Sequence, residues 1–251
     1  MQRHEQATLV ATSTEIVPHE ETIVRVVPVW ASPPNLRLLA MLGEARADAP
    51  AAALRVIRHR LEQWRTEGMW TFGVTSARDG EGKSTLAAQL ALVLSESQRA
   101  RVMLIEASMH RPSLARLFGC RVPPGFGFSV QLAHRMRSGN APPWAVMAVG
   151  PALHVLVESD AEQGFPEALH STHFRQAIEG LGRVYDWVVV DAPSVLGSGD
   201  ANVVEEAVDG IVVVARSHAS RGADLRAAVK QLGGRKAIGV VLWDASGAAA
   251  R

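Results

Sequence analysis

The fold is decided by the stretch Ala77-Arg78-Asp79-Gly80-Glu81-Gly82-Lys83-Ser84-Thr85, which lies between an apolar run at Trp70–Thr75 and an alanine-rich helical stretch at Leu86–Leu94. Gly80 and Gly82 can adopt backbone angles that other residues avoid, so consecutive N–H groups can point at phosphate oxygens at the positive end of the following helix. This is the Walker A pattern, with Ala77 in place of its usual first glycine. It predicts a phosphate-binding loop; the alternative is a glycine-rich turn that caps a helix.

The polar residues of this loop have distinct expected roles. Lys83 would supply a positive charge to the β- and γ-phosphates, and the Ser84 hydroxyl would ligate Mg²⁺. The residues expected to bind the cofactor here are Asp79, Gly80, Glu81, Gly82, Lys83, Ser84 and Thr85.

Length and composition favour one α/β domain with an appendage. The chain has 251 residues, with 26 Lys and Arg against 25 Asp and Glu, so its net charge does not suggest a nucleic-acid partner. The single cysteine, Cys120, excludes an intrachain disulfide and fits a reducing compartment. The first 18 residues lack the apolar core of a signal peptide, and no segment reaches the roughly 18 apolar residues of a membrane span. We expect a cytoplasmic protein whose membrane association, if any, comes from a partner.

Residues 1–50 differ from the rest of the chain. Prolines at positions 18, 28, 33 and 34 interrupt short apolar runs such as Ile23–Trp30. This pattern predicts a flexible N-terminal leader with one strand-like or docking segment, followed by a P-loop domain at 51–251. The domain would begin with an amphipathic helix, because apolar residues recur at helical spacing over Ala51–Arg65.

Beyond this helix, strand-like and helix-like segments alternate. The strand-like runs are almost uncharged, which is typical of strands buried on both faces. They are Trp70–Thr75, Arg101–Glu106, Leu153–Val157, Trp187–Asp191, Gly210–Ala215 and Ala237–Leu242. The helical patterns are Ser84–Ser97, Ser113–Leu117, Ser129–Arg137, Ser171–Leu181, Ala201–Ala207 and Ala223–Leu232, and the Pro/Gly-rich loops are Gly119–Gly127 and Ser138–Pro151. The alternation predicts an α/β fold with a doubly wound, mainly parallel sheet and a ligand at the carboxyl ends of its strands.

Two acidic residues end predicted strands. Asp191 follows the apolar residues Trp187–Val190, which is the Walker B pattern of a carboxylate that holds the magnesium water shell. Glu106 ends the run that starts at Arg101 and leads into a second loop. An acid at the end of a strand is also common as a helix cap or turn residue. Together with the Walker A loop, the metal-binding role is the better interpretation for Asp191.

Three motifs in a fixed order connect the chain to a known family. They are Ser76-Ala77-Arg78-Asp79-Gly80-Glu81-Gly82-Lys83-Ser84, then Glu106-Ala107-Ser108-Met109-His110-Arg111-Pro112, then Tyr185-Asp186-Trp187-Val188-Val189-Val190-Asp191-Ala192-Pro193. In this order they resemble the cytoplasmic ATPase domain of the bacterial tyrosine kinases (BY-kinases) that regulate exopolysaccharide and capsule assembly. The resemblance covers roughly Ala51 to Asp244. BY-kinases in turn resemble the partition and site-selection ATPases of the deviant Walker group.

The resemblance implies cofactors, partners and residue roles. The cofactors would be ATP and Mg²⁺, the partner a membrane-embedded polysaccharide chain-length (co-polymerase) protein, and the chain could form a homo-oligomer. Catalytic roles are implied for Lys83, Glu106 and Asp191, and metal binding for Ser84, Glu106 and Asp191. Arg216 and Trp243, at the ends of the last two predicted strands, complete the cofactor-binding set; Trp243 aligns with the family's adenine-contacting asparagine.

Several positions depart from the family pattern. Glu106 and Ser108 stand where the kinases have two aspartates, so one carboxylate is lost. The one tyrosine, Tyr185, precedes the Walker B strand and is expected to pack there, so a phosphorylated tyrosine cluster is absent from this sequence. In the ring-forming motif Glu-x-x-Arg-x-x-Arg, Ala52 replaces the acid.

These departures leave three hypotheses open. The first is an ATP-binding regulator of exopolysaccharide synthesis or export with weak or absent phosphoryl transfer. The second is an active tyrosine kinase that acts on other proteins. The third is a partition or positioning ATPase, in which Arg78 stands where that group carries a signature lysine.

Overall fold

The centre of the molecule is a run of six parallel strands that come from the six apolar segments of the sequence. The computed structural model describes residues 8–9, 16–19, 22–27, 30–31, 49–138, 142–159, 164–234 and 236–243. The strands lie in the order β12 (Ala237–Trp243), β11 (Gly210–Arg216), β5 (Thr71–Ser76), β10 (Trp187–Asp191), β6 (Val102–Glu106) and β9 (Leu153–Leu156). Every residue of β5, β6 and β10 is buried, as expected for strands covered on both faces. Each strand is within one residue of its predicted bounds.

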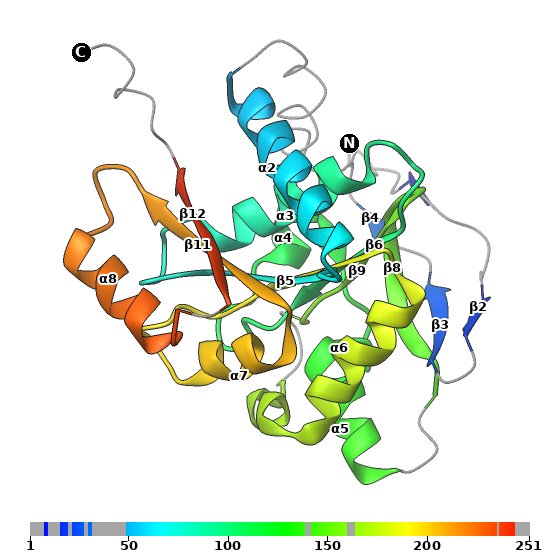
Figure 1. Ribbon diagram of the computed structural model, residues 1–251. Coiled ribbons are helices and arrows are strands. Elements are labelled where there is room, and N and C mark those ends of the chain that lie inside the picture. The colour runs from blue at the N-terminus through cyan, green and yellow to red at the C-terminus, as the bar shows by residue number, and fades with distance from the viewer. Residues whose placement is uncertain are drawn as a thin grey trace, which may run out of the picture.

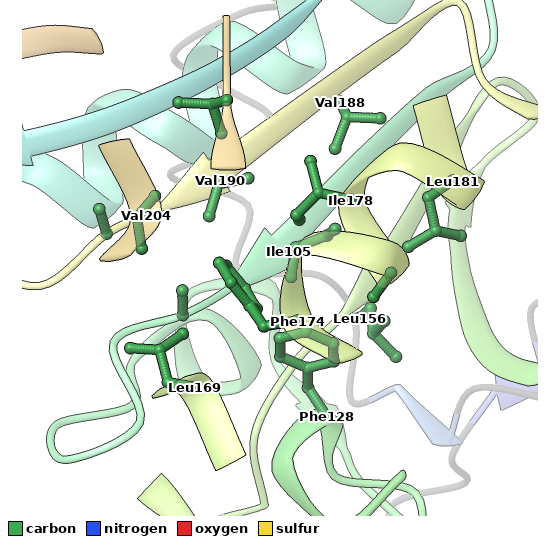
Figure 2. Packing of buried hydrophobic residues seen from close by; sticks show 14 of the residues in the cluster. Ile105, Phe128, Leu156, Leu169, Phe174, Ile178, Leu181, Val188, Val190 and Val204 are labelled. Carbon is green, nitrogen blue, oxygen red and sulfur yellow. The ribbon is translucent and has the colours of Figure 1, made fainter. Parts of the chain in front are cut away.

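Helices cover both faces of the sheet, so the predicted doubly wound α/β fold is confirmed (Figure 1). One face carries α2 (Ala49–Thr66), α3 (Lys83–Ser95) and α4 (Leu114–Phe118). The opposite face carries α5 (Phe128–Arg137), the short 3₁₀ helix η2 (Pro166–His170), α6 (Thr172–Val184), α7 (Asp200–Ala207) and α8 (Gly222–Gln231). Figure 2 shows the core on this second face, where Phe174, Ile178 and Leu181 of α6 lie near strand residues Ile105 and Val188.

Beyond β9 the sheet continues with a strand where a loop was predicted. β8 (Trp144–Gly150) pairs antiparallel with β9, and the turn at Pro151-Ala152 joins them. The prediction that 138–151 is a Pro/Gly-rich loop is therefore wrong for Trp144–Gly150. Its first four residues are buried, because an antiparallel hairpin partner gives this apolar run a place in the sheet despite the flanking prolines. The predicted loop Gly119–Gly127 likewise contains the two-residue strand β7 (Cys120–Arg121).

Part of the expected leader joins the main sheet. β3 (Thr22–Val27) pairs parallel with β8, and β2 (Ile16–His19) pairs antiparallel with β3. Val24 and Val26 are buried in the core on the α6 face, whereas Arg25 between them is exposed, as the alternation of a strand requires. The strand-like segment expected within residues 1–50 therefore lies at Thr22–Val27, whose apolar residues have a hydrophobic face to cover. The flexible character of the leader stays a prediction.

A small second sheet lies apart from the main one in hydrogen bonding. It is formed by β1 (Thr8–Leu9), β4 (Trp30–Ala31) and β7, all antiparallel. None of the helices described in the structure combines the length and the apolar character needed to cross a membrane.

Val24→Ala should lower the free energy of unfolding by about 2 kcal/mol, because the side chain is fully buried and its loss leaves a cavity under β3. Arg25→Ala on the same strand is the matched control and should change it by less than about 0.5 kcal/mol. Urea denaturation of both variants measures the difference. Equal and small effects would mean that Thr22–Val27 does not pack on the sheet in solution.

Candidate functional site

The site lies at the carboxyl ends of three neighbouring strands. β10 lies between β5 and β6, and its register places Asp191 beside Glu106 of β6 and beside Val74 of β5. The loop that follows β5 carries the Walker A residues and leads directly into α3. The predicted phosphate-binding loop and both acids predicted to act on the metal are thus brought to one edge of the sheet.

The loop has the backbone shape that its glycines were predicted to allow. Gly80 has φ 84° and Gly82 has φ 98°, both in the left-handed region that side chains disfavour. The Trp243 side chain packs against Gly82. A Cβ atom at this position would lie only 3.2 Å from the indole Cδ1. The first residue of α3 is Lys83, so the helix N-terminus faces the loop.

Hydrogen bonds hold the loop in this shape. The Ser76 hydroxyl donates to the carbonyl of Arg78 at 2.7 Å. The Glu81 carboxylate accepts a bond from the Arg78 N–H at 2.9 Å and another from the Ser220 hydroxyl, in the loop after β11. Glu81 is 6% exposed and does not line the cleft, so its side chain stabilises the loop from the protein interior.

A cleft of about 480 Å³ opens over the loop. The predicted cofactor-binding residues that line it are Asp79, Gly80, Gly82, Lys83, Ser84, Thr85, Arg216 and Trp243. The remaining lining residues are Arg111, Ser113, Arg116 and Leu117, which come from the loop after β6 and from α4. Arg111 belongs to the second quoted motif. Arg116 and Leu117 were missed, because nothing in the sequence indicates that α4 forms a wall of this cleft.

Asp191 has an unusual environment for a carboxylate. It is fully buried, and neither of its oxygens has a hydrogen-bond partner among the described residues. Burial raises the pKa of the Asp191 carboxyl to about 7, and the negative charge of Glu106 adds to this rise, while Lys83 and the Ser84 hydroxyl oppose it. An unpartnered buried carboxylate beside a hydroxyl fits a hard cation with oxygen ligands, so Ser84 and Asp191 suit Mg²⁺.

Glu106 makes a different set of contacts. Its Oε1 accepts bonds from the N–H groups of Ser113 at 2.5 Å and Leu114 at 2.8 Å, and its Oε2 accepts one from Glu158 at 3.0 Å. It is 0% exposed. Three backbone donors leave little acceptor capacity for a metal, so this residue anchors the loop to the start of α4. Its catalytic and metal-binding roles stay predictions.

The structure also shows where the other residues discussed with the family pattern lie. Ser108 is buried in the loop after β6. Tyr185 is 4% exposed, and its hydroxyl lies 2.7 Å from His154 Nδ1, which agrees with its expected packing role. Arg55 and Arg58 of α2 form ion pairs with Glu96 of the same chain, at 3.7 and 3.1 Å.

Comparisons with known proteins give a consistent picture. No family model matches the chain. The chain is 27% identical over 173 residues to a tyrosine-protein kinase named CpsD from Streptococcus agalactiae, a match that covers 67% of this chain and 72% of that protein. It is 31% identical over 145 residues to tyrosine-protein kinase YwqD from Bacillus subtilis (strain 168), covering 57% of this chain and 58% of that protein.

Solved structures agree with these relatives. The kinase domain of the Escherichia coli tyrosine kinase ETK superposes with a TM-score of 0.71 at 25% identity, covering 82% of this chain and 78% of that one. The BceF tyrosine kinase domain gives 0.61 at 25% identity, covering 84% and 90%. A structure of apo McdA, at 0.55 and 20% identity over 69% of this chain and 70% of that one, shares the fold. The predicted resemblance to the bacterial tyrosine kinases is confirmed.

Asp191→Asn should stabilise the nucleotide-free protein as pH rises. The folded-state pKa of Asp191 is about 7 against an ordinary value of 3.8, so the folded state holds the extra proton between these pH values and loses stability as pH rises through this range. The neutral amide escapes this loss. At about 1.4 kcal/mol per pKa unit, the variant should gain up to roughly 4 kcal/mol relative to wild type between pH 4 and 8.

Asp186→Asn is the control with the opposite sign. Partial burial of Asp186 raises the pKa of its carboxyl. Hydrogen bonds from the Arg101 N–H and the Arg65 side chain outweigh this effect, so the pKa is lowered overall. Its contribution is therefore present at neutral pH and is lost on acidification. Thermal melting without nucleotide or Mg²⁺ across this pH range measures both variants. A difference between Asp191→Asn and wild type that does not change with pH would contradict the assignment.

Proposed function

We propose that this chain binds ATP together with Mg²⁺ in the cleft above the Walker A loop. The observation that carries the proposal is the buried Asp191 carboxylate, which has no hydrogen-bond partner within the described residues and lies at the same sheet edge as Ser84 and Lys83. A buried unpaired carboxylate is costly unless a cation or donor meets it. The positive-φ loop and the helix N-terminus beside it suit phosphate groups.

Different residues of the cleft would contact different parts of the nucleotide. Lys83 would neutralise the β- and γ-phosphates, while Ser84 and Asp191 would hold the metal and its water shell. Bound Mg²⁺ supplies charge neutralisation on the phosphates. The indole of Trp243 offers a face for stacking on a purine, but it lacks the two hydrogen bonds that an amide would make with the base. Arg216 would lie near the same end of the nucleotide.

The proposed biological role is regulation of exopolysaccharide or capsule synthesis and export. This role rests on the resemblance to BY-kinases, which the similarity to proteins named as tyrosine-protein kinases supports. In this role the chain would work in the cytoplasm, at the inner face of the membrane, by docking on a membrane-embedded co-polymerase protein. A homo-oligomer would bring several such sites together.

We further propose that phosphoryl transfer is weak. The loop after β6 offers Ser108 where a second carboxylate would share metal binding and activation of the attacking hydroxyl, and Glu106 already accepts three backbone bonds. Tyr185 is buried and in contact with His154, so it is a poor phosphate acceptor. These features favour a protein that reports ATP occupancy over an efficient kinase.

A second candidate is a tyrosine kinase that acts on other proteins, which the names of the relatives favour. The partition or positioning role has less support. Arg78 would have to act across a dimer in that role, but its guanidinium bonds Asp224 of its own chain at 2.7 and 3.2 Å.

Lys83→Ala should weaken ATP binding about a hundredfold or more, because the site then loses the buried ammonium at the loop and leaves the phosphates to backbone amides and more exposed arginines. Lys230→Ala, an exposed lysine of α8 outside the cleft, is the matched control and should bind like wild type. Isothermal titration with Mg²⁺ and ATP measures all three proteins. Comparable affinities for wild type and Lys83→Ala would refute the site.

Purified wild-type protein should form little or no phosphotyrosine and turn over ATP slowly, and Ser108→Asp should raise turnover by about tenfold, which is roughly 1.4 kcal/mol of barrier. Ser108→Asn introduces a side chain of nearly the same shape as aspartate but without its charge, so it should leave turnover unchanged. Radiolabelled ATP, with a tyrosine-rich peptide as acceptor, measures both reactions. Strong phosphotyrosine formation by wild type would favour the second candidate instead.

A further inference from the structure

The Asp79 carboxylate lies between the two cations that are best placed to meet nucleotide phosphates. Its Oδ1 is 3.6 Å from Lys83 Nζ, and its Oδ2 is 3.3 Å from Arg111 NH1. All three residues line the cleft. The acid is thus an anion of the protein itself, paired with the lysine to which the proposed function assigns the phosphates.

The two acids of the loop differ in what they contact. Glu81 is buried and hydrogen-bonded to Arg78 and Ser220, so it builds the loop. The Asp79 side chain is 41% exposed, and no backbone N–H of the described residues donates to it. Its partners are two cations, and removing it would leave the hydrogen bonds of the loop in place. The loop therefore does not need Asp79 for its shape.

We propose that Asp79 is an internal competitor of the nucleotide phosphates and sets how strongly the site prefers a triphosphate. This inference rests on the proposed function and deepens it. The carboxylate holds Lys83 and Arg111 in the free protein, and phosphates must replace it at one or both cations. Two negative groups cannot share the same cations without mutual repulsion, so binding requires the side chain to turn away.

The competition depends on the number of phosphates. A diphosphate in the loop reaches Lys83, so Asp79 can keep its contact with Arg111. A triphosphate extends further along the cleft, and its terminal phosphate competes for Arg111 as well. The carboxylate therefore opposes ATP at two contacts and ADP at one, and its removal should help ATP more.

The test is isothermal titration of the full chain with ATP and with ADP in the presence of Mg²⁺. Asp79→Asn should tighten ATP binding about tenfold and ADP binding less, because the amide keeps the shape and removes the charge. Asp79→Glu keeps the charge and should therefore not give the tightening expected of Asp79→Asn. Glu62→Gln, on α2 and outside the cleft, controls for the loss of one negative charge.

Arg111→Gln gives a second, independent measurement. In wild type, Asp79 partly neutralises Arg111. The substitution Arg111→Gln should therefore lower ATP affinity less in wild type than in the Asp79→Asn background. Additive effects of the two substitutions would overturn the proposal, as would ATP affinity that is unchanged or weaker in Asp79→Asn. Melting without nucleotide should give Asp79→Asn the same midpoint as wild type within about 2 °C; a lower midpoint would make Asp79 a structural residue.

Failure of this inference can be distinguished from failure of the proposed function. If wild type binds ATP in a manner that depends on Lys83 while Asp79→Asn binds no better, the nucleotide site stands and only the competition is refuted. If wild type and Asp79→Asn both fail to bind ATP and ADP, the proposed function fails and the inference fails with it. Binding by Asp79→Asn alone would support the inference in its strongest form.

Discussion

The site depends on the register between β6 and β10, which places two buried acids, Glu106 and Asp191, side by side. Like charges in a buried environment cannot both stay ionised and unpartnered. The structure treats the two acids differently: Glu106 receives three backbone hydrogen bonds, and Asp191 receives none among the described residues. Glu106 therefore fixes the loop after β6 to the start of α4, whereas no described donor occupies the oxygens of Asp191. The adjacent strand β5 places the phosphate-binding loop beside Asp191.

Most of the fold could be predicted from the sequence, because the central strands leave little choice. Runs such as Trp187–Asp191 contain only apolar residues before an acid, and any other placement would expose them. Trp144–Gly150 was missed because nearby prolines and glycine suggest a loop, whereas its strand pairing depends on β9 and on β3 from far away in the sequence. A strand whose pairing depends on a distant segment such as β3 cannot be recognised from a local pattern.

The chemistry of the site was less predictable than its location. The spacing of the Walker A residues fixes which side chains surround the cleft, and that spacing is local. The contacts that each acid of the loop makes, in contrast, depend on residues far away in the sequence. Glu81 contacts Ser220 in the loop after β11, and Asp79 contacts Arg111 in the loop after β6. The pairing of Arg58 with Glu96 is similar, since these residues are 38 positions apart and meet because α2 lies on α3.

The strand order also sets the distance over which the leader could influence the nucleotide cleft. From β3 to β5 the sheet crosses five strand-to-strand steps, and each step is about 4.8 Å, so roughly 24 Å of hydrogen-bonded backbone separates them. A protein that bound at β2 and β3 would therefore lie several strands away from the cleft. Within the main sheet its presence would be conveyed as a change in sheet twist or strand position through β8, β9, β6 and β10. A shorter connection runs through β4, whose partner β7 directly follows the cleft-lining helix α4. The last two strands of the main-sheet route carry Glu106 and Asp191, so a displacement from the β3 edge would arrive at the two buried acids before it reached β5.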